Sequence, residues 1–160
     1  YAAAVAKFGT DRVRANGTLP WRIQEFFRNA TRSFQNVDRS LNGRFELMLF
    51  AASLGHYVAD ATQPLHTVSN SDGQLTGQRG VHARFERMLF QRYRNQVTLT
   101  PPSIAPVKDP LAFAFDTILE SSQQAEPVLK ADRDAIGRGD VYDDAYFEKF
   151  FRAEIGRAHV

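Results

Sequence analysis

This chain contains two histidine–carboxylate pairs with the same spacing, and they limit the folds that it can adopt. His56 precedes Asp60 by four residues, and His82 precedes Glu86 by the same interval. On an α-helix this spacing places both side chains on one face, about one turn apart. His66 adds a third imidazole between the two pairs. The sequence therefore predicts two helices that each carry a pair of potential metal ligands.

The types of these five side chains favour zinc. Imidazole and carboxylate bind zinc where a protein offers no thiolate, and this chain has no Cys. Two His and one carboxylate also leave an open zinc position for water, whose pKa falls toward about 7 on the metal. We therefore expect a zinc site among the candidate ligands, which are His56, Asp60, His66, His82 and Glu86.

Length and composition fit one compact domain. The 160 residues are 43% hydrophobic and include 13 Phe, which suffices for a sizeable core. The formal net charge of +2 neither favours nor excludes binding to nucleic acid. No run of about 18 apolar residues occurs, so we expect no membrane insertion. A single domain over residues 1–160 is the expectation.

Apolar residues recur at helical spacing along the chain, and no stretch shows strand alternation. The predicted class is therefore all-α, a compact multi-helix domain with the metal site between two core helices. The spacing and the capping signals predict helices over residues 1–8, 19–34, about 44–62, 81–93, about 109–125 and 143–155. Pro127 is expected to kink or end the fifth of these helices. The proline-rich residues 99–110 and the glycine-containing residues 137–140 are predicted connections.

Both ligand pairs lie on helical stripes that are otherwise apolar, and we expect both stripes to face the core. Phe34, on the preceding helix, is likewise expected in the core, and Arg84 is expected on a solvent-facing side. Ions buried without partners cost several kcal/mol each, and a divalent cation would neutralise the carboxylates. The apolar members of the two stripes are Phe45, Met48, Leu49, Ala52 and Ala59 for the first pair and Phe85, Leu89 and Tyr93 for the second.

The segment between the pairs predicts a turn followed by a loop. Pro64 disfavours helical geometry at the preceding residue, so His66 should enter from a turn. Residues 67–80 are rich in Ser, Asn, Asp, Gln and Gly and should form a loop over the site. Its polar side chains either line a phosphate site or stabilise the turns, and we favour the second interpretation for Asn70, Asp72 and Gln74. Arg79 and His159 are expected in solvent.

The ligand order resembles that of the zinc-dependent bacterial phospholipases C and single-strand-specific nucleases, a superfamily of all-α phosphodiesterases with three zinc ions. The matching motifs are His56-x3-Asp60-x5-His66, Gln-Pro-Leu-His at residues 63–66, and His82-x3-Glu86. The resemblance implies that His66, His82 and Glu86 hold one zinc. It also implies that His56 and Asp60 help to hold a second zinc, and that Asp60 bridges to a third. Asp60 and Glu86 are the carboxylates that it implicates in catalysis.

The resemblance also implies a function and a location. The expected substrate is a phosphodiester, either a phospholipid or a single-stranded nucleic acid, hydrolysed by metal-activated water. The Gln-Pro-Leu-His run is closer to the nuclease branch, whereas Glu86 is closer to the phospholipase branch. Members of the superfamily are exported, so a periplasmic or extracellular location is expected.

The sequence departs from this superfamily before His56. Further ligands in the superfamily come from an N-terminal Trp and from a His and an Asp ahead of the first ligand helix, whereas this sequence begins with Tyr1 and has no His before His56. We therefore expect a missing N-terminal segment that supplies further ligands, or a reduced variant with one complete zinc site.

Two alternatives from other classes remain open. A helical bundle with a dinuclear iron centre also uses His and carboxylates at helical spacing, although no Glu-x-x-His occurs here. A non-catalytic protein that keeps a single structural zinc is the second alternative.

Overall fold

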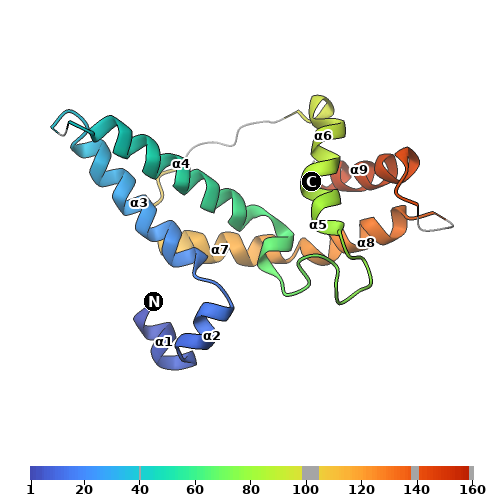
Figure 1. Cartoon of the computed structure of the whole chain (residues 1–160), viewed down its shortest axis with the longest axis horizontal. Helices are drawn as coiled ribbons and strands as arrows, with labels where there is room; N and C mark the ends of the chain where they lie inside the picture. The colour runs from blue at the N-terminus through green and yellow to red at the C-terminus, as the bar shows by residue number, and fades with distance from the viewer. Residues whose placement is uncertain (40, 99–104, 138–140, 159–160) are drawn as a thin grey trace. The chain divides into compact units, whose positions relative to one another are not determined.

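A computed structural model describes residues 1–39, 41–98, 105–137 and 141–158 of the chain, with side chains up to residue 154 (Figure 1). Within these ranges the regular structure is helical and no strand is present, which confirms the all-α class. The chain divides into two compact units, each described here by itself. The single domain expected over residues 1–160 stays a prediction.

The first unit consists of Tyr1–Gln63 and Pro106–Leu119. Helices α3 and α4 pack side by side as an antiparallel pair (Figure 1). The predicted helices over residues 1–8, 19–34 and 44–62 are confirmed to within one or two residues. The helices of this unit are α1 (Ala2–Phe8), α2 (Thr10–Ala15), α3 (Leu19–Gln35), α4 (Gly43–Thr62) and most of α7 (Pro110–Ser122).

The core of the first unit lies where α3, α4 and α7 meet. Ile23, Ala61 and Ala114 are its fully buried members. Phe26 extends this core along α3, because its ring packs edge-on against the rings of Phe50 and Tyr57 on α4, with centroids 5.8 and 5.1 Å apart. The packed face of α4 is therefore the one that carries Phe50 and Tyr57.

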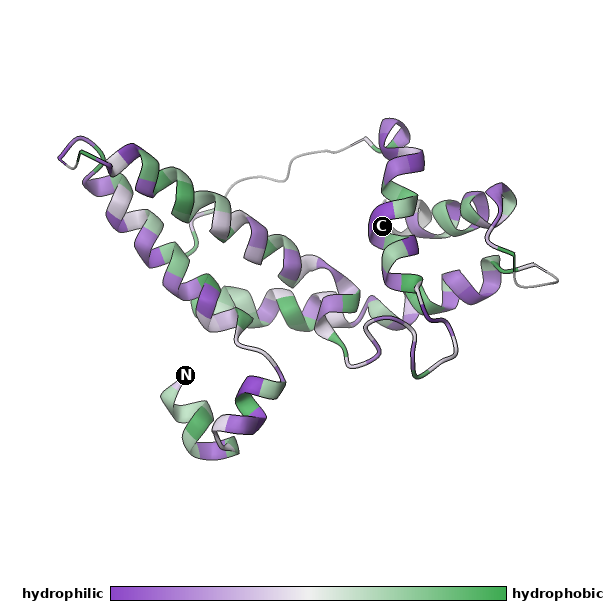
Figure 2. Cartoon of the chain, viewed as in Figure 1, coloured by the Kyte–Doolittle hydropathy of each residue, from purple (hydrophilic) through white to green (hydrophobic). Residues whose placement is uncertain are grey.

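The prediction that the stripe of His56 faces the core is wrong. The side chain of His56 is 71% exposed. Figure 2 shows hydrophobic residues along much of α4, so the spacing of apolar residues fits either face of this helix. Packing against α3 buries the face of α4 opposite His56. Four large apolar residues that were expected in the core are exposed by half or more: Phe34, Phe45, Met48 and Leu49.

The second unit consists of Pro64–Ala105 and Glu120–Val160. The predicted helix over residues 81–93 is present, but its middle is a π-helical turn. The elements of this unit are η1 (Pro64–Thr67), α5 (Val81–Ala83), the π-helical η2 (Arg84–Leu89), α6 (Phe90–Tyr93), η3 (Arg94–Gln96), α8 (Ala125–Ala135) and α9 (Asp144–Ala158). Helices α8 and α9 pack against each other, and α8 also contacts η1.

An apolar cluster joins η1, α5, η2, α8 and α9. Leu65 from η1 and Val81 from α5 are fully buried within it, so the segments that carry His66 and His82 are both anchored in the core. The other buried members are Leu89, Val128, Leu129, Ala131, Ala135, Tyr146, Phe147 and Phe150.

The expected continuation of one helix to residue 125 is wrong. Helix α7 ends at Ser122, and Pro127 lies in the first turn of α8. Proline is tolerated in a first turn because its missing N–H has no helical partner there. Of the predicted connections, residues 99–104 and 138–140 lie outside the described residues, as does His159. Across the part of the chain that the structure describes, no helix is both long and apolar enough to cross a membrane.

Candidate metal centre

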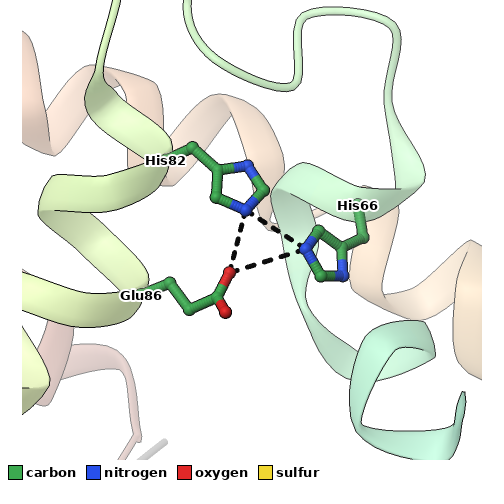
Figure 3. Close-up of side chains that lie close together, drawn as sticks. All are labelled: His66, His82 and Glu86. Atoms are coloured by element: carbon green, nitrogen blue, oxygen red, sulfur yellow. Dashed lines mark hydrogen bonds and ion pairs between the residues drawn. The ribbon is translucent and has the colours of Figure 1, made fainter. Parts of the chain in front are cut away.

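His66, His82 and Glu86 bring three ligand atoms together in the second unit (Figure 3). The Nε2 atoms of His66 and His82 are 3.1 Å apart. Oε2 of Glu86 lies 2.8 Å from Nε2 of His82 and 3.5 Å from Nε2 of His66. The structure thus brings together the three residues expected to share one zinc.

The turn before His66 forms as the sequence predicted. Helix α4 ends at Thr62, and Gln63 has the extended geometry that a following proline favours, with φ −84° and ψ 114°. The next residues form the 3₁₀ turn η1, which is closed by a 2.7 Å hydrogen bond from the Thr67 hydroxyl to the Pro64 carbonyl. Leu65 is buried, and this fixes the turn that presents His66.

His82 is oriented by the loop that precedes it. Nδ1 of His82 is 2.9 Å from the carbonyl oxygen of Ser71. A carbonyl oxygen only accepts hydrogen bonds, so this contact is a hydrogen bond when Nδ1 carries a proton. In the neutral ring the lone pair is then on Nε2, which points at His66 and Glu86. Metal-binding histidines usually have such a partner on the second ring nitrogen.

Glu86 lies in the π-helical turn, one turn after His82. Its side chain is 49% exposed, and those of His66 and His82 are 28% and 31% exposed. The prediction that this pair is buried in the core is therefore wrong. The site is open to solvent, so the argument from the cost of burying unpaired ions does not apply. The evidence for a metal site is the convergence of the three ligand atoms.

His56 and Asp60 lie on α4, in the first unit. Nε2 of His56 is 3.4 Å from Oδ2 of Asp60, which is the contact expected of residues four apart on a helix. Their participation in a second zinc site stays a prediction, as does the catalytic part expected of Asp60.

Asn70 and Gln74, two polar residues of the loop over residues 67–80, bind the loop itself. Asn70 donates to Thr76 and accepts from the backbone N–H of Leu75. Gln74 bonds the carbonyl of Ser69 and the N–H of Asp72. These contacts are the turn chemistry that we favoured over a phosphate site. Arg79 is exposed, as expected.

Arg84 was expected at the surface and is instead buried in the second unit. Its guanidinium forms an ion pair with Asp132 of α8, at 3.0 Å from Nε and 3.2 Å from Nη2, and donates to the carbonyls of Gln78 and Arg79. Burial alone would lower the pKa of Arg84, but the hydrogen bond and charge of Asp132 raise it above its ordinary value.

Asp132 is fully buried and receives further donors. The amide of Gln78 donates to it at 2.6 Å, and the hydroxyl of Tyr146 donates to its Oδ1. Burial, together with the bond to Asp132, raises the pKa of Tyr146 above its ordinary value. Asp132 stands on the apolar face of α8 beside Val128 and Leu129. In the sequence, this network could have been found from the carboxylate of Asp132, which lies on an otherwise apolar helical stripe.

Comparisons with known proteins give no family for this chain. No family model, no curated protein and no solved structure matches it. The function is therefore inferred from the site and from the spacing of its ligands.

Proposed function

We propose that this chain is a zinc-dependent hydrolase of phosphodiesters in which His66, His82 and Glu86 hold the zinc. The observation that carries the proposal is the convergence of one carboxylate oxygen and two imidazole nitrogens at separations of 2.8 to 3.5 Å. Ligand atoms about 2.0–2.1 Å from a tetrahedral zinc are about 3.3 Å from one another. The three separations lie around this value.

The surroundings of the three ligands also suit a metal ion. The proton on Nδ1 of His82 directs a lone pair toward His66 and Glu86. A cation between these atoms would be attracted by all three. A proton on Nε2 of His82 would satisfy the same contacts, so metal and proton compete, and zinc affinity should fall as the pH falls.

Three protein ligands leave a coordination position for water, and zinc lowers the pKa of bound water to about 7. The residues of this chain hold the metal in place and leave it accessible to a substrate. His66 and His82 are held from the core by Leu65 and Val81. Glu86 lies at the solvent-facing side of the site, where a substrate can approach.

The phosphodiester substrate is supported by the sequence resemblance alone. The spacing of His56, Asp60 and His66 and the Gln-Pro-Leu-His run at residues 63–66 are its main features. Phospholipid and single-stranded nucleic acid are the two substrates that follow from it. Under the same proposal, His56 and Asp60 contribute to a second zinc that needs further ligands.

Zinc binding is tested by a pair of matched variants. Glu86→Gln removes one ligand charge and should weaken zinc binding by at least about tenfold, whereas Glu126→Gln alters an exposed carboxylate on α8 and should leave it unchanged. Isothermal titration with zinc and elemental analysis of the purified protein measure this. Equal affinity in the two variants would contradict the site.

Hydrolysis is tested side by side on single-stranded DNA and on a phosphatidylcholine analogue, with and without a chelator. We expect turnover of one of them that the chelator abolishes and that Glu86→Gln loses. Zinc at one ion per chain with no turnover of either substrate would favour the structural alternative. Iron with a visible charge-transfer band would favour the dinuclear alternative.

A further inference from the structure

The backbone at the start of the helix that carries His82 and Glu86 is hydrogen-bonded to a side chain outside that helix. Asp72, in the loop over residues 67–80, accepts hydrogen bonds on Oδ1 from the backbone N–H groups of Gly80 and His82, at 3.0 and 3.3 Å. The first N–H groups of a helix lack partners within it. Gly80, at the N-cap, has no side chain to supply one, so Asp72 does so from ten residues before His82.

The residue before Asp72 binds the ring of the same histidine. The carbonyl of Ser71 accepts from Nδ1 of His82. Adjacent loop residues therefore hold both the backbone and the imidazole of one candidate ligand. The bonds from Gly80 and His82 to Asp72 thus tie the loop to the helix next to the Ser71 carbonyl that meets the ring.

We propose that Asp72 is a positioning residue for His82. Through its bonds to Gly80 and His82 it holds the Ser71 carbonyl at Nδ1, keeps the ring proton there, and leaves the Nε2 lone pair for the metal. The metal part of this inference rests on the proposed zinc site, whereas the tautomer part concerns the metal-free protein.

The rest of the loop supplies a control. Asn70 bonds Leu75 and Thr76, which both belong to the loop itself. Asn70→Ala therefore loosens the loop without removing the connection to His82. Asp72→Ala removes the acceptor, Asp72→Glu keeps the charge and displaces the acceptor, and Asp72→Asn keeps an oxygen acceptor at the same place and removes the charge.

Imidazole ¹⁵N NMR of the zinc-free full chain reports the tautomer of His82. We expect a proton on Nδ1 of His82 in the wild type, in Asp72→Asn and in Asn70→Ala. Asp72→Ala and Asp72→Glu should show a mixture of tautomers. In zinc titrations these two variants should bind about 10–100-fold more weakly, and Asp72→Asn should restore most of the affinity.

The outcomes separate this inference from the proposed function. An unchanged tautomer in both disrupting variants overturns it, and so does an equal effect of Asn70→Ala. If Asp72→Ala does not fold, the tautomer and the zinc affinity of Asp72→Glu and Asp72→Asn test the inference instead. A wild type that binds no zinc contradicts the proposed function, and the tautomer in the variants still tests the role of Asp72.

Discussion

Arg84 is a buried cation placed two residues from each of two candidate ligands, His82 and Glu86. A charge in such a place is costly unless it is paired and hydrogen-bonded. Asp132 supplies the opposite charge, and Gln78 and Tyr146 donate to the remaining positions of that carboxylate. Since Gln78 belongs to the loop, this network attaches the loop to α8.

Replacement of Tyr146 by Phe tests the network through its pH dependence. At neutral pH we expect a loss of about 1–2 kcal/mol in the free energy of unfolding, because Asp132 loses a buried donor. The pKa of Tyr146 is raised in the folded state, so above its ordinary value of 10.0 the unfolded chain ionises first. The contribution of this phenol is therefore complete below that pH and is lost as the pH rises further.

The wild type should thus lose stability more steeply than Tyr146→Phe as the pH rises above about 10. Urea unfolding followed by circular dichroism measures both slopes. Tyr142→Phe is the matched control, because it keeps the aromatic ring that lies over Arg84. Parallel alkaline slopes for wild type and Tyr146→Phe would show that the network does not protect this phenol.

The helix over residues 81–93 forms as predicted, but its π-helical turn changes which residues share a side. Arg84 and Leu89 are five residues apart and both are buried. In an α-helix residues five apart point about 140° away from each other, whereas π-helical hydrogen bonds between residues five apart bring them together. The turn thus lets Arg84 and Leu89 enter the core while Glu86 faces solvent.

The loop before this helix depends on glycine at one position for space as well as for backbone conformation. Gly73 and Gly77 both have left-handed backbones, with φ of 70° and 74°. A Cβ on Gly73 would lie 2.6 Å from the carbonyl oxygen of Gln78, whereas a Cβ on Gly77 would meet nothing within 4 Å. Alanine in place of Gly77 would therefore introduce backbone strain alone, whereas alanine in place of Gly73 would also introduce a steric clash.

We expect Gly77→Ala to cost about 1 kcal/mol of stability through strain alone. Gly73→Ala should cost at least about 2 kcal/mol and should also weaken zinc binding, because the backbone of Gln78 must move. Chemical denaturation and zinc titration of both variants measure these effects. Equal losses in the two variants would mean that the loop accommodates the clash.

At the scale of the whole chain, the three ligands of the zinc site belong to one of the two compact units. His66, His82 and Glu86 all lie in the unit that contains α8 and α9. A ligand that binds only the folded state stabilises it by about 2.7 kcal/mol at a free concentration one hundred times its Kd. Zinc should therefore stabilise this unit directly.

We expect zinc to raise the Tm of the full chain and a chelator to reverse the rise. Hydrogen exchange should show that added zinc slows amide exchange more in η1, α5 and η2 than in α1 and α2. Glu86→Gln should lose both effects. A Tm that zinc raises equally in this variant would place the stabilising metal elsewhere.

The features that could be predicted from the sequence depend on neighbours within one or two helical turns. His82 and Glu86 meet because residues four apart share a face of a helix, and η1 begins at Pro64 because of the restriction that proline imposes on Gln63. The all-α class follows from the same short-range periodicity. These properties need no knowledge of what packs against each helix.

Which faces are buried and which distant residues meet depends on the packing of the helices and loops. Helix α4 is apolar on both sides, so packing against α3 decided that Met48 and His56 face solvent. Arg84 pairs with Asp132 across 48 positions in the sequence, and the loop reaches back to orient His82. Burial and long-range hydrogen bonding depend on the positions of other elements, and the spacing within one helix does not encode them.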